Sequence, residues 1–190
     1  SYLTPAFDMG GVTLSGTATY DPNAGAGPAA PGSSGTNSLG GTAYTIKAVM
    51  GGIEIGAGVE EQETALTTPT SEESNVTGYI VYKNGPLGIM YQEVQNNAAA
   101  NSVTTGSDYD GEIWGISFAQ GDWAMSYVEQ TENKDSPGAT SNGKEVEMNA
   151  ITASYTMGAM SIKGGIFETT NPEYTTGKYE ETEIALSFAF

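Results

Sequence analysis

Hydrophobic and polar residues alternate at every second position along most of this chain. The clearest case is the stretch 180–190, in which Ile184, Leu186, Phe188 and Phe190 are separated by small or polar residues. A period of two places successive side chains on opposite faces of a β-strand. This stretch therefore predicts a strand with one apolar face, which we expect to close a barrel whose outer surface meets lipid.

Nine earlier segments carry the same pattern, so the chain is predicted to contain ten full strands. Their lengths of about 8–13 residues bracket the roughly 9–11 residues that cross a membrane in a tilted barrel wall. Segment 1–7 is extended, contains a proline and is expected to add part of an eleventh strand. No segment has the 3.6-residue period of a helix, so we expect essentially no helix. The ten predicted strands are 12–20, 42–50, 53–61, 76–83, 87–95, 109–120, 123–130, 145–157, 160–169 and 180–190.

The connections between these segments are alternately short and long. The short ones contain glycine, which favours tight hairpin turns, and the long ones are polar. Up-and-down transmembrane barrels have short turns on the periplasmic side and long loops outside. The sequence therefore predicts one all-β domain over 1–190, folded as an antiparallel up-and-down transmembrane β-barrel or as the C-terminal part of one. The short turns are 8–11, 51–52, 84–86, 121–122 and 158–159, and the long loops are 21–41, 62–75, 96–108, 131–144 and 170–179.

Aromatic residues flank the apolar faces of the predicted strands. In a barrel such residues form girdles at the two membrane interfaces, where their rings lie at headgroup level. A soluble β-sandwich is the alternative, because its strands also alternate and also carry aromatics. The loop pattern and the small residues on the other face favour the barrel. The residues expected to face lipid or a neighbouring subunit are Tyr44, Trp114, Trp123, Tyr155, Phe188 and Phe190.

Composition excludes several classes of function. The net charge is −17, from 23 acidic residues and 6 basic residues, all of them lysine, so the chain has no electrostatic footprint for nucleic acid. The absence of cysteine excludes disulfides and thiolate chemistry, and the absence of histidine excludes His-dependent triads and zinc sites built on histidine. We therefore do not expect an enzyme.

The polar residues on the small-residue face are the candidate functional groups. Carboxylates such as Glu54 and Glu60 can serve in general acid–base pairs, but on the wall of a lumen they are more simply ion-selectivity groups. The acidic excess predicts a preference for cations. The residues expected to line the pore are Thr13, Thr17, Lys47, Glu54, Glu60 and Lys163.

Acidic clusters in the predicted loops raise the question of calcium. Oxygen-rich loops can bind Ca²⁺, but none here has the spacing of an EF-hand loop. A solvated acidic rim is the interpretation we favour, and we expect no other cofactor. If a calcium site exists, Asp108, Asp110 and Glu112 are the first candidates.

Three segments carry a family resemblance. Segment 1–20 opens with SYLTPAF and ends with GVTLSGTATY, segment 146–167 contains ASYTMG, and segment 180–190 ends on an aromatic residue after alternating apolar positions. They are similar to a mid-barrel hairpin, the penultimate hairpin and the C-terminal assembly signal of the general bacterial porins, especially the alphaproteobacterial type. The resemblance extends along the whole chain as architecture more than as aligned motifs.

This resemblance implies an outer-membrane porin of a Gram-negative bacterium. Such a protein is a homotrimer, meets the barrel assembly machinery through its last strand, and lets small hydrophilic solutes and ions diffuse through a water-filled channel. Its barrel has roughly sixteen strands, so the first strands would lie upstream of Ser1. Two alternatives stay open: a complete ten-stranded barrel with 1–7 as a lead-in, and a structural or adhesive surface protein whose long loops carry the function.

Overall fold

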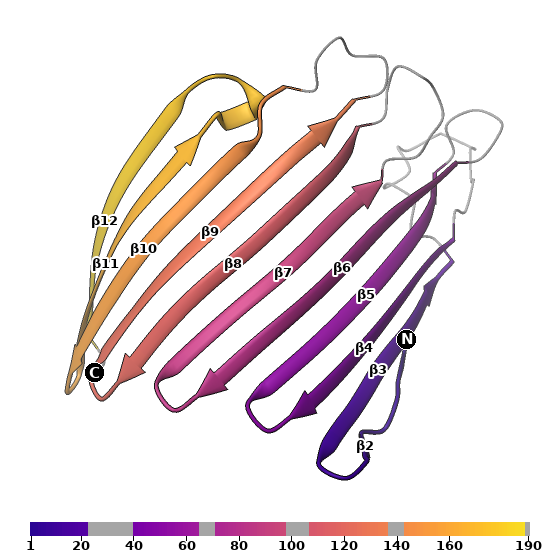
Figure 1. Ribbon diagram of the computed structural model, residues 1–190, viewed down its shortest axis with the longest axis horizontal. Coiled ribbons are helices and arrows are strands. Elements are labelled where there is room, and N and C mark those ends of the chain that lie inside the picture. Colours follow the sequence, from indigo (N-terminus) through magenta and orange to yellow (C-terminus); the bar gives the residue numbers. More distant parts are fainter. Residues whose placement is uncertain (23–39, 65–70, 98–106, 137–142, 189–190) are drawn as a thin grey trace, which may run out of the picture.

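The strands of this protein form one antiparallel sheet, in which each strand from β3 to β12 pairs with its neighbours in the sequence (Figure 1). The computed structural model describes residues 1–22, 40–64, 71–97, 107–136 and 143–188. Up-and-down order is thereby confirmed, as are ten full strands preceded by a short extended segment. The strands are β1 Tyr2–Leu3, β2 Phe7–Asp8, β3 Val12–Asp21, β4 Gly41–Met50, β5 Ile53–Thr64, β6 Ser71–Asn84, β7 Leu87–Asn97, β8 Asp108–Gln120, β9 Trp123–Asp135, β10 Val146–Met157, β11 Met160–Thr170 and β12 Lys178–Phe188.

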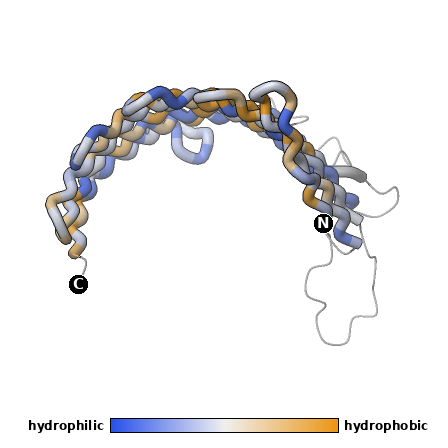
Figure 2. Tube along the Cα trace, turned by 90° about the horizontal axis from the view of Figure 1, so that it is seen from below, coloured by the Kyte–Doolittle hydropathy of each residue, from blue (hydrophilic) through white to orange (hydrophobic). Residues whose placement is uncertain are grey.

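The sheet is a single curved layer. Figure 2 shows it end-on as an arc with open sides. At one edge β12 pairs with β11, and at the other β1 and β2 both pair with β3. The arc does not close on itself within the described residues, and no second sheet covers it there. The soluble sandwich therefore does not describe these residues, and a closed barrel stays a prediction.

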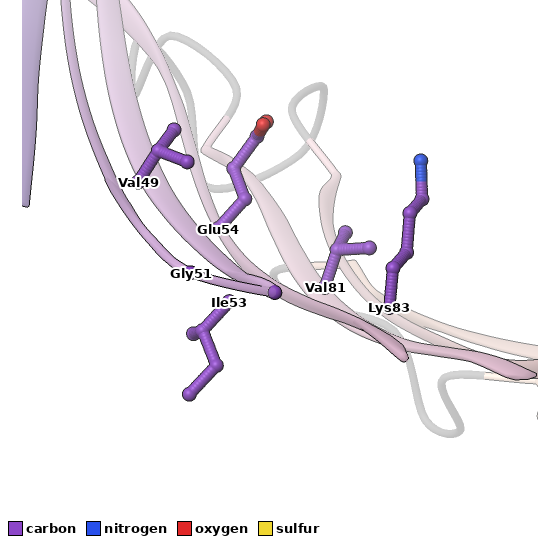
Figure 3. Close-up of a pocket in the computed structure, with 7 residues that line it drawn as sticks. Val49, Gly51, Ile53, Glu54, Val81 and Lys83 are labelled. Atoms are coloured by element: carbon purple, nitrogen blue, oxygen red, sulfur yellow. The ribbon is translucent and has the colours of Figure 1, made fainter. Parts of the chain in front are cut away.

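The two faces of the arc are identified from the cross-strand registers. Glu54 of β5 pairs with Val49 of β4 and Val81 of β6, so these three side chains share one face. Figure 3 shows them, together with Lys83, projecting into the arc, whereas Ile53 projects outward. Registers from β3 to β12 run without interruption, so each row of paired residues can be followed around the sheet. We call the inner side the concave face and the outer side the convex face.

Glycine starts each of the four short turns from β4 onward. Gly51, Gly85, Gly121 and Gly158 have φ angles of 56–60°. The second residue of each turn has no positive φ, which is the pattern of a type II′ hairpin turn. This turn matches the right-handed twist of the strands, so the predicted short turns are confirmed at these positions.

Several strands are longer at the loop end than the hydrophobic pattern predicts. The longest extensions bring β5 to Thr64, β6 back to Ser71 and β9 to Asp135. The added residues are polar on both faces, so hydrophobicity stops alternating although the backbone ladder continues. The predicted loops 62–75 and 131–144 were therefore too long.

Helix is almost absent from the described part of the chain. One 3-10 turn, η1, spans Pro172–Tyr174 between β11 and β12. In the same residues there is no helix with the length and hydrophobicity of a membrane span.

The fold has almost no apolar interior. Val146, at 7% exposure, is the one buried hydrophobic side chain of the described residues, whereas Ile184 on the convex face is 78% exposed. Hydrogen-bonded ladders and cross-strand side-chain pairs therefore hold the sheet together. Exposed apolar surface on this scale marks a face that meets another apolar phase or a partner.

Candidate channel-lining face

Small residues dominate the concave face. Their short side chains project only a little way into the space inside the arc, and the hydroxyl groups among them can hydrogen-bond water. The small residues on this face include Thr13, Ser15, Thr17, Thr19, Thr45, Gly56, Gly58, Thr77, Gly88, Gly115, Ser117, Ser126, Thr152, Ser154, Ser161, Gly165, Ala185 and Ser187.

Hydroxyl and amide side chains on this face pair across neighbouring strands. Thr17 and Thr45 share a hydrogen bond of 2.6 Å between their Oγ1 atoms, and Ser126 and Thr152 share one of 2.8 Å. Gln92 donates from Nε2 to Oγ1 of Thr77 at 3.0 Å. Each pair satisfies polar groups along the wall and stabilises the strand register.

Carboxylates outnumber lysines among the charged side chains of the concave face. All six residues expected to line a pore lie on this face: Thr13, Thr17, Lys47, Glu54, Glu60 and Lys163. The charged residues of the described strands on this face are Asp8, Asp21, Glu54, Glu60, Glu73, Glu132, Glu181 and Glu183, with Lys47, Lys83, Lys134 and Lys163.

A small cluster on β4, β5 and β6 organises part of this surface. Tyr79 donates its hydroxyl hydrogen to Oε1 of Glu54 at 2.9 Å, and Nζ of Lys47 lies 3.9 Å from Oε2 of the same carboxylate. The side chains of Lys47 and Glu54 remain 46% and 39% exposed, so water weakens this ion pair. The ring of Tyr79 lies over Gly56, its cross-strand partner, where a Cβ atom would be 2.5 Å from Cζ. Tyr79 can therefore hold the carboxylate of Glu54 because residue 56 is a glycine, which leaves room for the tyrosine ring.

A shallow hollow lies beside this cluster, over β6 to β9. Gly88 and Gly115 thin the wall there, and Val81, Met90 and Val128 line it. The hollow has a volume of about 280 Å³. Its apolar floor contrasts with the polar surface around it.

The convex face is apolar near the short turns and carries the predicted aromatics. Trp123 and Tyr155 are cross-strand partners with ring centroids 4.5 Å apart, and the rings of Trp114 and Tyr127 are 5.1 Å apart. All of the predicted lipid-facing residues that the structure describes are on this face: Tyr44, Trp114, Trp123, Tyr155 and Phe188. Phe190 lies outside the described residues.

Acidic side chains follow the apolar band of the convex face on its loop side. Tyr91 donates its hydroxyl hydrogen to Glu93 at 2.6 Å, and Glu129 accepts from Nε1 of Trp114 at 3.1 Å and from the hydroxyl of Tyr127 at 2.8 Å. These aromatics have an apolar body toward the band and a polar tip toward carboxylates. They lie where the surface changes from apolar to charged, as interfacial aromatics do.

The calcium candidates all lie on β8, which includes Asp108 of the predicted loop 96–108 as well as the two candidates of the predicted strand 109–120. Asp108, Asp110 and Glu112 occupy alternate positions of β8, all on the convex face. Alternate residues of a strand are about 7 Å apart, so three carboxylates in one row do not converge on one ion. No cluster of three or more potential metal ligands occurs in the described ranges.

Several residues of the concave face were missed by the sequence analysis. Lys83 and Tyr79 could have been predicted from the alternation of β6, because they lie on the face opposite its apolar positions. Glu132 and Lys134 lie in a predicted loop, where both faces are polar and no contrast marks a strand. Tyr174 belongs to a segment without periodicity, so nothing in the pattern pointed to it.

Comparisons of this chain with protein-family models, with curated proteins and with solved structures find no match.

Proposed function

We propose that this protein is an outer-membrane porin whose concave face lines a water-filled channel. Small hydrophilic solutes and ions diffuse through the channel down their gradients, without cofactor or catalytic turnover. The convex face meets lipid in the outer membrane of a Gram-negative bacterium, and the porin is a homotrimer. The last strand engages the barrel assembly machinery.

The observation that carries this proposal is the segregation of the two faces of a single sheet. Large apolar and aromatic side chains form an exposed band on the convex face near the short turns, with carboxylates only on the loop side of that band, while small and polar residues make up much of the concave face. Transfer of each large apolar side chain from water into an apolar phase is worth about 1.5–3 kcal/mol. Lipid outside and water inside satisfies both faces at once, which is the arrangement of a porin wall.

The free edges of the arc support closure into a barrel. An uncovered strand edge leaves backbone hydrogen-bonding groups without partners, and in lipid each such group costs several kcal/mol. We propose that further strands join β12 to the opposite edge at β1 and β2. The curvature in Figure 2 brings the two edges round toward the same side of the sheet.

Charge on the concave face supports a preference for cations. The excess of carboxylates on the proposed lumen wall is more informative than the net charge of the chain, because ions meet only the lumen wall. Rings of acidic side chains select cations in other channels. Glu54 is one of the carboxylates on the concave face, and the hydrogen bond from Tyr79 fixes the position of its side chain.

Planar-bilayer recording of the purified, membrane-inserted protein tests the proposal. We expect stepwise increases in current as single channels insert, and a reversal potential in a KCl gradient with the sign of a cation-preferring pore. Insertion without current steps would refute the channel, and a clear anion preference would refute the selectivity.

A matched pair of variants assigns the selectivity to the concave face. Glu54→Gln removes a charge from the proposed lumen and leaves Lys47 without its carboxylate partner, so the cation preference should fall. Glu112→Gln removes the same charge from the convex face and should leave the reversal potential unchanged. Equal effects of the two variants would show that the concave face is not the conducting one.

A further inference from the structure

The connection between β11 and β12 folds over the concave face. We call residues 171–177 the strap. Figure 2 shows one short segment lying inside the arc, at the horizontal position that η1 has in Figure 1. The strap reaches across β10, and its Tyr174 contacts side chains of β8 and β9. It therefore overhangs the loop end of the proposed lumen.

Tyr174 is the main contact between the strap and the wall. Its hydroxyl donates a hydrogen bond to Oε1 of Glu132, and its ring centroid lies 6.1 Å from that of Tyr109. Nζ of Lys134 lies 5.4 Å from the ring centroid of Tyr174 and 5.7 Å from that of Tyr109. Glu132, Lys134 and Tyr109 are all concave-face residues, so the wall holds Tyr174 by a hydrogen bond and by cation–π attraction.

The phenol of Tyr174 is suited to this role. Burial raises its pKa above the usual range, and the hydrogen bond to Glu132 raises it further. The hydroxyl group therefore keeps its proton at any physiological pH and remains a donor to the carboxylate.

Backbone contacts hold the strap at its base and at its side. The N–H of Asn171 donates to the carbonyl of Gly177 at 2.8 Å, which closes the strap at its base. Asn171 also donates from Nδ2 to the carbonyl of Glu145 at 2.9 Å, and the N–H of Lys144 donates to the carbonyl of Tyr174 at 3.1 Å. The strap is thus bound to the segment that precedes β10 as well as to β9.

The strap backbone is in a conformation that its residues do not favour by themselves. Asn171, Glu173 and Tyr174 have φ angles of 53°, 54° and 59°, in the left-handed region that non-glycine residues rarely adopt. Such conformations persist where surrounding contacts hold them, and they concentrate at functional sites. Gly143 permits the close approach, because a Cβ atom there would lie 2.8 Å from Cβ of Tyr174.

We infer that the strap is a fixed constriction at the loop-side mouth of the channel, and that Tyr174 is the residue that locks it in place. This inference rests on the proposed porin function. The strap narrows the path between the outside and the concave face, so it limits the unitary conductance.

Unitary conductance of Tyr174→Ala tests the constriction. The strap loses its hydrogen bond and its ring contacts, so we expect conductance to rise by about 1.5- to 2-fold, because ion flow follows pore cross-section. Tyr174→Phe keeps the ring and removes the donor, so its conductance should lie between those of the wild type and the alanine variant. Thr176→Ala, an exposed position of the same strap, is the control and should match the wild type. Wild-type conductance in both Tyr174 variants would overturn the inference while leaving the porin function intact.

A nitroxide label tests the lock without any current. The chain has no cysteine, so Thr176→Cys gives one labelling site on the strap. In the otherwise unchanged protein we expect the nitroxide to have low rotational mobility. This mobility should increase when Tyr174→Phe or Tyr174→Ala is added. An unchanged spectrum in both variants would contradict the role of Tyr174 in holding the strap. If the label becomes more mobile but the protein forms no channels, the contacts of Tyr174 are supported and the proposed porin function is refuted.

Discussion

At the scale of single residues, Gly56 shows how the concave face positions a charge. Tyr79 can lie flat over this glycine only because no Cβ atom is present, and from there it donates to Glu54. Aromatic residues that cover a glycine in a neighbouring strand stabilise sheets in the same way. The glycine therefore acts on the proposed selectivity through Tyr79 and not through any contact with ions.

Substitution of Gly56 tests this coupling. A Cβ atom at this position would lie 2.7 Å from Oη of Tyr79, so Gly56→Ala forces the ring to move and weakens its hydrogen bond to Glu54. We expect a loss of about 1 kcal/mol in the free energy of unfolding, at the low end of the range for overpacking because the ring can shift. Urea unfolding in lipid vesicles measures it.

Gly78 provides the matched control for this substitution. It lies in the adjacent strand, and a Cβ atom there would meet no atom within 4 Å. Gly78→Ala should be neutral or stabilising by up to about 1 kcal/mol, because alanine restricts the unfolded chain. Equal losses of unfolding free energy in the two variants would show that displacement of Tyr79 is not the cause of the loss at Gly56.

At the scale of elements, alternation alone gives each strand one side that is more apolar and one side that is more polar. Ile80 and Val81 are neighbours on β6 with similar size and shape, but Ile80 pairs with the convex residues Ile55 and Tyr91 whereas Val81 pairs with the concave residue Glu54. The same substitution at these two positions therefore reports what each face contacts.

Arginine at these two positions should have very different costs. Ile80→Arg places a charge on the proposed lipid-facing surface and should destabilise the inserted protein by about 2–4 kcal/mol, the cost of arginine near the bilayer midplane. Val81→Arg places it in the proposed lumen, so we expect less than about 1 kcal/mol and a lower cation preference. Urea titration of both variants in vesicles checks the difference, and similar losses would contradict a lipid-facing convex surface.

The strands were predictable where hydrophobicity alternates. From β3 to β12 the apolar positions alone identify every strand, and Gly51, Gly85, Gly121 and Gly158 mark the short turns. The pattern fails at the loop ends, because residues such as Glu132 and Lys134 are polar on both faces while the hydrogen-bonded ladder continues.

The strap could not be predicted from the sequence for a different physical reason. Its contacts join residues far apart in the chain, such as Tyr174 and Glu132, and no local periodicity encodes them. Its backbone angles also contradict local preference, since Asn171, Glu173 and Tyr174 adopt the left-handed region without being glycine. Only tertiary contacts select this conformation.

At the scale of the whole molecule, one curved sheet has two faces of different chemistry, which suit two different surroundings. Hydrophobic burial inside the protein contributes little, since Val146 is the one buried hydrophobic side chain of the described residues. The arc is therefore expected to be stable where lipid covers its convex face and partners pair with its edges. The central claim is that water fills the concave side and lipid covers the convex side.

Cysteine modification during current recording tests this claim most directly. Ser154 and Ala153 are adjacent small residues of β10, with Ser154 on the concave face beside Lys163 and Ala153 on the convex face beside Gly164. The chain has no cysteine, so each single-cysteine variant has no background reaction. A membrane-impermeant cationic thiol reagent should lower the unitary current of Ser154→Cys and leave that of Ala153→Cys unchanged. Modification of Ala153→Cys with no effect on Ser154→Cys, or equal effects on both, would contradict the account.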